Sequence, residues 1–186
     1  MLEAITSIDT RIFLAINGAH TDFLDFTLFW VSNKVIWLPF YAFLVYLLAL
    51  HYKKQAWVLI TLAVLLVVMS DQTSVHFFKD IIHRLRPCHN PAIMALVRLP
   101  DGHCGGEYGF VSSHAANSFG LAVYVGYFLN RKIRRFMIVL LVWAVLICYS
   151  RVYMGVHYPL DVLIGAAWGS LLAAGMVRWG ASLIKN

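Results

Sequence analysis

Residues 136–150 read FMIVLLVWAVLICYS, a run of 15 residues without a charged side chain. Four similar uncharged runs occupy residues 35–50, 55–70, 112–130 and 162–177. A helix needs about 20 mostly apolar residues to cross the hydrocarbon core of a bilayer. Flanking lysines and arginines extend each run, because their long side chains reach the interface. The pattern therefore predicts five transmembrane helices, near residues 33–51, 55–78, 112–130, 135–151 and 161–179.

The composition excludes most other classes of protein. The chain has 186 residues, of which 61% are hydrophobic and 13% are charged. A soluble domain typically has about 45–50% apolar and about 25% charged residues, so the composition disfavours a soluble fold and excludes a disordered or collagen-like chain. The length fits a single domain over residues 1–186. We expect an all-α integral membrane helical bundle of five to six transmembrane helices with an N-terminal amphipathic segment.

The first 32 residues differ from the rest of the chain. Their apolar residues are interrupted by Glu3, Asp9, Arg11, Asp22 and Asp25. A secretory signal would have a basic start and a clean apolar core, and neither is present. The segment is expected to lie in the membrane interface as one or two amphipathic helices. A sixth span remains the alternative, although it would have to bury charges.

The distribution of charge gives an orientation to the five spans. One side collects eight cations and no acid. They are Lys53, Lys54, Arg131, Lys132, Arg134, Arg135, Arg178 and Lys185. Short basic loops stay in the cytoplasm, so the loop 79–111 is expected to be extracytoplasmic. The formal net charge of +6 is then a signal of topology, and no nucleic-acid partner is implied.

Three polar stretches meet this outer face, at residues 79–87, 109–114 and 150–161. They contain three cations, Lys79, Arg86 and Arg151, and two serines, Ser112 and Ser113, where a helix should begin. Arginine binds phosphate oxygens in a bidentate manner, and lysine adds a point charge. A helix start adds free backbone N–H groups and a favourable dipole. Lys79 and Arg86 would share a face if a helix continued through both. The set predicts a phosphate site.

Two histidines complete the chemistry of this site. His157 and Asp161 are four residues apart, so the carboxylate can orient the imidazole and stabilise its cation. Such a pair is typical of a nucleophile with its orienting partner. His114 is a second imidazole, free to act as a general acid on the leaving oxygen.

These spacings match a family. Lys79 to Pro87 reads K-x6-R-P, and Ser150 to Asp161 reads S-R-x5-H-x3-D. Between them, residues 111–114 stand where the family has P-S-G-H, with Val111 in place of proline and Ser113 in place of glycine. The chain resembles the type 2 phosphatidic acid phosphatase superfamily, in its bacterial membrane-integrated lipid phosphatase branch.

The resemblance implies a role for each matched residue. His157 would attack phosphorus and form a phosphohistidine, Asp161 would hold His157, and His114 would protonate the leaving group and then activate water. The phosphoryl oxygens would be held by Lys79, Arg86, Arg151, Ser112 and the backbone of Ser113. The family needs no metal and no cofactor, and three fixed cations can stabilise charge where another enzyme uses Mg²⁺.

Two cysteines lie in the outer loop. Cys88 and Cys104 are sixteen residues apart and could form a disulfide in an oxidising periplasm. Cys88-His89 and His103-Cys104 could instead bind Zn²⁺. Adjacent ligand pairs suit a tetrahedral site poorly, so a disulfide is favoured. Free thiols are the third alternative.

The sequence thus predicts a multi-pass phosphatase of the bacterial inner membrane, with its active site at the periplasmic face and a lipid phosphate as its partner. Candidate substrates are undecaprenyl pyrophosphate, phosphatidylglycerol phosphate, phosphatidic acid and lipid A phosphates. The location of the site on the outer face favours undecaprenyl pyrophosphate or a lipid A phosphate. The alternatives are a phosphotransferase that uses the same phosphohistidine, a membrane haem carrier or ion pathway, and a non-enzymatic lipid-binding protein. The oligomeric state stays open.

Overall fold

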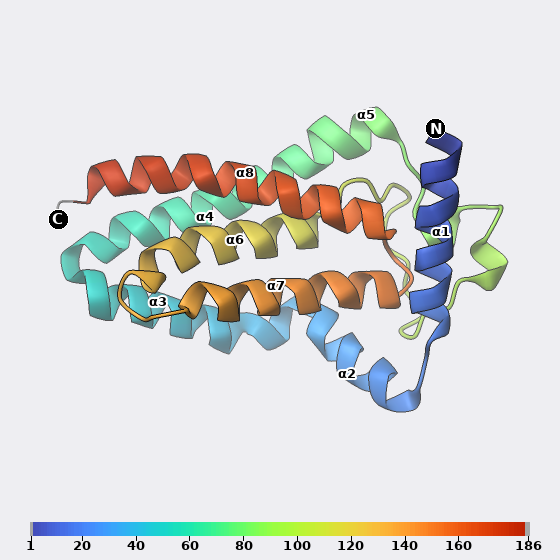
Figure 1. Ribbon diagram of the computed structural model, residues 1–186, viewed down its shortest axis with the longest axis horizontal. Helices are drawn as coiled ribbons and strands as arrows, with labels where there is room; N and C mark the ends of the chain where they lie inside the picture. Colours follow the sequence, from blue (N-terminus) through green and yellow to red (C-terminus); the bar gives the residue numbers. More distant parts are fainter. Residues whose placement is uncertain (1, 185–186) are drawn as a thin grey trace.

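The computed structural model describes residues 2–184, and within them every regular element is helical (Figure 1). The longer helices are α1 (Leu2–Gly18), α2 (Asp22–Ser32), α3 (Leu38–Tyr52), α4 (Ala56–Thr73), α6 (Ser113–Asn130), α7 (Phe136–Tyr153) and α8 (Pro159–Leu183). A π-helical turn (Ser74–Lys79) and the short α5 (Asp80–Ile82) continue α4. The predicted all-α bundle with an N-terminal amphipathic segment is confirmed.

Five helices, α3, α4, α6, α7 and α8, run along the bundle (Figure 1). Their bounds lie within a few residues of the predicted spans, except at the start of α3. There Asn33 caps a 3₁₀ turn, Lys34–Trp37, and Pro39 stands in the first turn of the helix. Proline is well accommodated in a first helical turn, where its missing N–H costs no hydrogen bond. The helix therefore begins at Leu38 rather than at residue 33.

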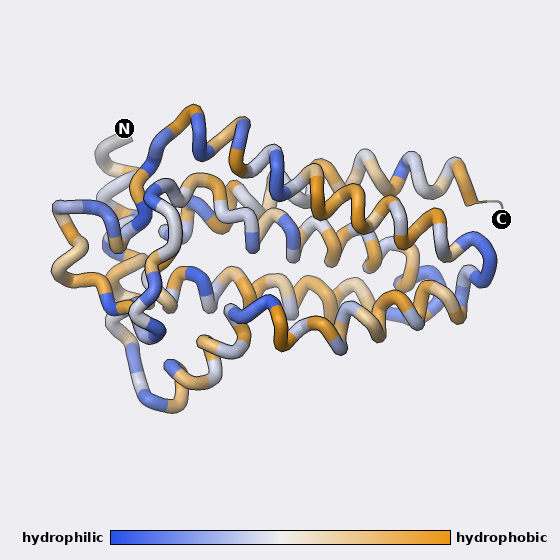
Figure 2. Tube along the Cα trace, turned by 180° about the vertical axis from the view of Figure 1, so that it is seen from behind, coloured by the Kyte–Doolittle hydropathy of each residue, from blue (hydrophilic) through white to orange (hydrophobic). Residues whose placement is uncertain are grey.

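The surface divides as a membrane protein requires. Apolar residues dominate the middle of the bundle, and polar residues gather at its two ends (Figure 2). By length and composition, three helical segments within residues 2–184 qualify as membrane spans. They are Lys34–Ile82, which turns back between α3 and α4, Phe136–Tyr153 and Pro159–Leu183. The structure is that of a multi-pass membrane protein.

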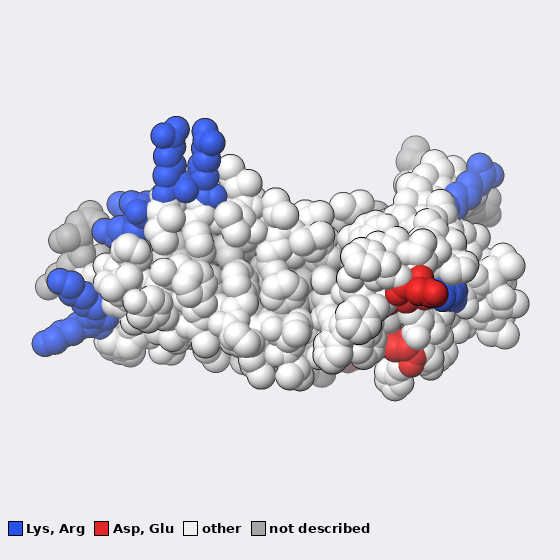
Figure 3. Space-filling model, turned by 90° about the horizontal axis from the view of Figure 1, so that it is seen from below, with Lys and Arg blue, Asp and Glu red and all other residues white. Residues whose placement is uncertain are grey.

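The basic loops meet at one end of the bundle. The α3–α4 turn and the α6–α7 loop line a common hollow with Lys53, Lys54, Arg131 and Lys132. On the face seen in Figure 3, this end shows lysines and arginines without an acid, whereas the acids lie at the opposite end. Lys185, assigned to the basic side from the sequence, lies outside the described residues.

Helix α6 is the centre of the bundle. Ten of its 18 residues are buried, and it packs against α4, α7 and α8. Its sequence is rich in alanine, glycine and serine, and such small residues let helices approach closely within a membrane. A helix surrounded by protein has no need of a lipid-compatible surface. The three segments that qualify as membrane spans are accordingly more apolar than α6.

Two glycines of α8 allow this packing. A Cβ on Gly165 would lie 2.6 Å from the carbonyl oxygen of Ser112, and a Cβ on Gly169 would lie 1.9 Å from that of Ala116. The backbone of α6 therefore occupies the space where side chains of α8 would stand. Gly165 and Gly169, a G-x3-G pair, thus pack α8 within the bundle.

Helix α1 lies roughly perpendicular to the long helices, across the end of the bundle opposite the basic loops, which is called the outer end below (Figure 1). Asp9, Phe13 and Asn17, spaced four apart, form its buried face. Ile8 and Ile12 are exposed on another face. This pattern is that of an amphipathic helix.

The outer loop is fastened to this N-terminal region. The Asn17 amide donates hydrogen bonds to the carbonyl oxygens of Arg98 and Tyr153, both at 2.8 Å. Arg98 binds both oxygens of Asp25, at 2.8 and 2.5 Å. This hydrogen-bonded guanidinium lowers the pKa of the Asp25 carboxyl. Residues far apart in sequence thus hold the loop against α1 and α2.

One helical expectation was wrong. Lys79 and Arg86 do not share a helix face, because the helix ends at Ile82 and His83 adopts a left-handed conformation with φ of 51°. The residue before a proline disfavours the α region, and Arg86 precedes Pro87 in extended backbone. Arg86 therefore reaches the outer end of the bundle on a loop.

We predict that Gly169→Ala destabilises the protein by about 1–3 kcal/mol, because the added methyl group would overlap the α6 backbone and force the helices apart. Thermal unfolding in detergent would measure the change. Gly175→Ala on the same helix is the matched control, since nothing lies within 4 Å of a Cβ there. Equal losses in the two variants would contradict this account of the packing.

Candidate active site

Backbone contacts bring the three polar stretches together at the outer end. The Gly109 N–H donates to the carbonyl of Arg84 at 2.9 Å, and the Arg86 N–H donates to that of Glu107 at 3.0 Å. The Ser112 N–H donates to the carbonyl of Asp161 at 3.0 Å. The first two bonds place the arginine loop beside the start of α6, and the third places that start against α8.

His157 lies in the turn before α8 and is buried together with Asp161. Its Nδ1 is 3.6 Å from Oδ2 of Asp161. The same carboxylate oxygen accepts the Tyr158 N–H at 2.9 Å. Gly155 forms the preceding turn with φ of +80°, where a Cβ would lie 2.5 Å from the Arg98 carbonyl oxygen. The turn thus fixes the imidazole beside the carboxylate, the geometry of an oriented nucleophile.

The start of α6 supplies the serines. Ser112 is the N-cap, and its hydroxyl accepts the Ala115 N–H at 3.5 Å. The Ser113 hydroxyl accepts a hydrogen bond from Lys79 Nζ at 3.0 Å. Lys79 is the last residue of the π-helical turn that continues α4. The serine in place of the family's glycine therefore positions one of the expected phosphate-binding cations.

Arg86 and Arg151 bring positive charge to the site, and each guanidinium has few hydrogen-bond partners. Arg86 Nη1 donates to the Val156 carbonyl at 3.3 Å, and Arg151 Nη1 donates to the Ser32 hydroxyl. The Nε atoms of both arginines and Nδ1 of His157 are buried without a hydrogen-bond partner in the structure. Buried polar groups are normally satisfied. Unpaired cationic donors around an imidazole therefore make a site for an anion.

His114 lies in the first turn of α6 and faces two environments. It interacts electrostatically with Arg151 and His157. It also lines an apolar cavity of about 400 Å³ that runs between α3, α4, α6 and α7. Lys34 and Ser32 border the same cavity. His114 thus stands where the charged cluster meets an apolar groove.

All the residues expected from the sequence gather at this end of the bundle. Electrostatic interactions join His157 to Arg86, Arg151 and Lys79. The sequence did not assign a role to Arg84. Its guanidinium donates to Asp161 Oδ1 at 2.6 Å and to Asp9 Oδ2 at 2.5 Å. It also lies over the ring of Tyr158, 4.2 Å from the centroid.

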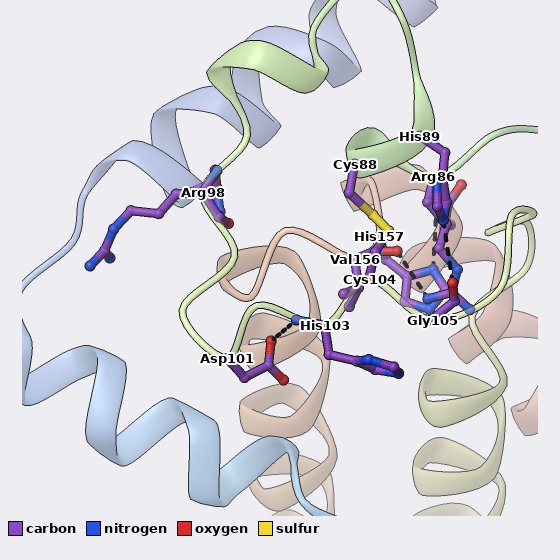
Figure 4. The surroundings of a disulfide bond; sticks show 12 residues. Arg86, Cys88, His89, Arg98, Asp101, His103, Cys104, Gly105, Val156 and His157 are labelled. Atoms are coloured by element: carbon purple, nitrogen blue, oxygen red, sulfur yellow. Dashed lines mark hydrogen bonds and ion pairs between the residues drawn. A yellow bond between two sulfur atoms is a disulfide. The ribbon is translucent and has the colours of Figure 1, made fainter.

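A disulfide closes the outer loop beside the cluster. Cys88 and Cys104 are bonded, with their Cα atoms 6.1 Å apart. Figure 4 shows the bridge close to Arg86 and His157. A Cβ on the neighbouring Gly105 would lie 3.7 Å from the Arg86 guanidinium carbon, so the bridged loop packs on that side chain. His89 completes a group whose ligand atoms lie within 4.8 Å of one another, but both sulfurs are used in the covalent bond.

Burial and neighbouring cations set the protonation of His157. Desolvation, and then the charges of Arg86, Arg151 and Lys79, lower the pKa of the imidazole well below its usual range. Burial also lowers the pKa of the Arg86 guanidinium, an effect that Asp161 opposes. The imidazole is therefore neutral at pH 7, and a neutral imidazole is the nucleophilic form.

Comparison with known proteins agrees with this geometry. The model of the PAP2 superfamily matches residues 58–185. The chain is 40% identical to the lipid A 4'-phosphatase of Bacteroides thetaiotaomicron over 173 residues, which are 91% of this chain and 75% of that protein. It is 34% identical to the lipid A 4'-phosphatase of Porphyromonas gingivalis over 174 residues, 92% of this chain and 72% of that protein.

Two crystal structures share the fold. The transmembrane PAP2 type phosphatidylglycerolphosphate phosphatase of Bacillus subtilis superposes with a TM-score of 0.76, covering 97% of this chain and 88% of its own at 23% identity. Aquifex aeolicus LpxE superposes with a TM-score of 0.65, covering 91% and 94% at 24% identity. At these identities the likeness concerns the fold alone.

Fold, site and relatives define a class: a membrane-integrated lipid phosphatase. The chain belongs to the PAP2 superfamily, whose model matches well over half of it. The family resemblance that the sequence indicated is confirmed.

We predict that Arg86→Gln raises the pKa of His157, because the variant removes a cation that disfavours the imidazolium. An NMR titration of histidine-labelled protein in detergent would measure it, with His157→Gln identifying the signal. In the unsubstituted protein the His157 signal should titrate below pH 6.5, the usual value for histidine. A midpoint above that value would contradict the burial argument.

We predict that replacing both bridged cysteines, Cys88→Ser with Cys104→Ser, lowers the free energy of unfolding by about 3 kcal/mol, the chain-entropy value for a loop of this size. A reducing agent should destabilise the unsubstituted protein and leave the double variant unchanged. Unfolding curves in detergent would show both effects. Free thiols at both Cys88 and Cys104, found by alkylation and mass spectrometry of protein from its native membrane, would contradict the bridge.

Proposed function

We propose that this protein hydrolyses the 4'-phosphate of lipid A at the periplasmic face of the bacterial inner membrane. The observation that carries the proposal is the place of His114, between the cationic cluster and the apolar cavity. A substrate must therefore present a phosphate group and an apolar body side by side, as a lipid phosphate does. The two lipid A 4'-phosphatases that resemble this chain favour lipid A over the other candidate lipids.

The first chemical step forms a phosphohistidine. The imidazole nitrogen of His157 that faces the substrate, Nε2, attacks phosphorus as the bond to the leaving oxygen breaks. The carboxylate of Asp161, 3.6 Å from Nδ1, stabilises the positive charge that develops on the ring. His114 gives a proton to the sugar oxygen as the bond between that oxygen and phosphorus breaks, so the sugar leaves with a hydroxyl group.

The second step releases phosphate. His114, now neutral, takes a proton from a water molecule, and the oxygen of that water attacks the phosphorus of the phosphohistidine. The bond between nitrogen and phosphorus breaks, and His157 returns to its starting state. One histidine thus acts first as general acid and then as general base.

Charge on the phosphoryl oxygens is balanced by protein cations. Lys79, Arg86 and Arg151 come from three different parts of the chain, and the buried Nε donors of the two arginines have no hydrogen-bond partner among the described residues. The hydroxyl of Ser112 and the backbone N–H of Ser113 add donors at the start of α6. Three positioned cations stabilise the transition state without a divalent metal in this proposal.

The lipid enters from the bilayer. The cavity beside His114 is lined mainly by apolar residues of α3 and α4, such as Leu44 and Val64, and Val64 is exposed on the membrane-facing surface. An acyl chain placed there would stay in an apolar environment while the phosphate reaches the cations. Residues 1–186 then act as one catalytic domain. Its segment 79–111, which contains the Cys88–Cys104 disulfide, lies outside the membrane.

The proposal predicts that His157→Ala lowers phosphate release from lipid A by roughly 10³-fold or more, the usual loss for a catalytic nucleophile. Purified protein in detergent would be assayed on lipid A, undecaprenyl pyrophosphate, phosphatidylglycerol phosphate and phosphatidic acid. Lipid A should turn over fastest, and EDTA should not change the rate. His51→Ala is the control and should behave as the unsubstituted protein, because His51 lines the hollow at the opposite, basic end of the bundle.

Other outcomes separate the alternatives. Wild-type turnover by His157→Ala would overturn the phosphohistidine mechanism, and loss of activity with EDTA would overturn the metal-free one. Faster turnover of another lipid in the panel would reassign the substrate. Phosphate transfer to an added lipid or sugar acceptor, with less free phosphate, would indicate a phosphotransferase.

A further inference from the structure

The charge network behind Asp161 reaches the N-terminal helix. Arg84 bridges two buried carboxylates, Asp161 at 2.6 Å and Asp9 at 2.5 Å. Asp9 uses its other oxygen to accept the N–H of Leu160 at 2.9 Å, in the first turn of α8. Both ends of the network therefore meet the helix that carries Asp161. Asp9 lies outside residues 58–185, the part of the chain that the family model matches.

The net charge of Arg84, Asp161 and Asp9 affects how well a positive charge on His157 is stabilised. Arg84 and Asp161 alone would form a neutral ion pair, and a neutral pair stabilises a developing imidazolium poorly. Asp9 adds a second carboxylate to the same guanidinium, so the three groups together carry one negative charge. Charge interactions are strong where solvent is excluded, and Asp9 and Asp161 are 5% and 0% exposed. The negative charge therefore acts on the ring nitrogen that faces Asp161.

Geometry supports the same conclusion. Arg84 takes Oδ1 of Asp161, which leaves Oδ2 for His157 and the Tyr158 N–H. The guanidinium also lies against the Tyr158 ring, so its own position is fixed. Bonds to both sides of a carboxylate restrict its rotation, and second partners of this kind orient catalytic groups.

We propose that Asp9 and Arg84 are positioning residues of the active site: they hold the Asp161 carboxylate toward His157 and supply the net negative charge that stabilises the His157 cation. The inference rests on the proposed role of His157 as the nucleophile. It makes the docking of α1 a requirement for catalysis, since Asp9 is on the buried face of that helix.

The test uses Asp9→Asn, which keeps an oxygen for the Leu160 N–H and removes both the charge and the oxygen that accepts from Arg84. We expect kcat on the lipid substrate to fall about tenfold, while KM and the unfolding temperature stay close to those of the unsubstituted protein. The His157 signal in the NMR titration should move to lower pH, because its cation has lost a favourable charge. Arg84→Gln should have the larger effect on kcat, since it leaves two buried carboxylates without their cation.

Matched controls are Asp22→Asn and Arg11→Gln, two exposed charges of the N-terminal segment. Both should behave as the unsubstituted protein. Unchanged kcat and an unchanged His157 titration in Asp9→Asn, with His157→Ala inactive, would overturn this inference alone. A loss of kcat that follows a lower unfolding temperature, without a shift of the His157 titration, would assign Asp9 a structural role and also overturn it. Turnover by His157→Ala would overturn the proposed function itself.

Discussion

Helices α6 and α8 approach so closely that no side chain fits at Gly169, where a Cβ would lie 1.9 Å from a backbone oxygen of α6. The same approach joins the Ser112 N–H to the Asp161 carbonyl at 3.0 Å. The start of α6, where we propose that phosphate binds, is thereby placed against α8, which holds Asp161. A wider separation would leave both helices intact and the site dispersed.

The sequence could predict most of the fold, because the bilayer imposes long uncharged runs whose ends are marked by basic residues. Candidate site residues could also be named, since their spacing matches a family, and their roles remain a proposal. The prediction that Lys79 and Arg86 share a helix face was wrong, because the left-handed conformation of His83 ends the helix between them. That conformation is uncommon for a residue other than glycine, and nothing in the spacing indicated it.

The partnership of Arg84 with Asp9 was not found, for a physical reason. The two residues are 75 positions apart, and only the docking of α1 brings them together. An arginine near a membrane surface is usually a head-group contact or an interfacial anchor. One signal was available: Asp9, Phe13 and Asn17 recur every four residues, which marks a buried face that contains a carboxylate. A buried carboxylate needs a cation, and Arg84 is that cation.

Different contacts hold the three cations of the proposed site, and in the proposed mechanism their fixed positions favour catalysis. Arg86 is packed under a loop closed by a disulfide, Arg151 is tied to Ser32 of α2, and Lys79 is bonded to Ser113. Each long side chain has thus lost rotational freedom before a substrate binds. Charges fixed in advance need no reorganisation in the transition state, which is where electrostatic catalysis gains most. In the proposed mechanism, the hydroxyl of Ser113, which a glycine would lack, therefore contributes by restraining Lys79.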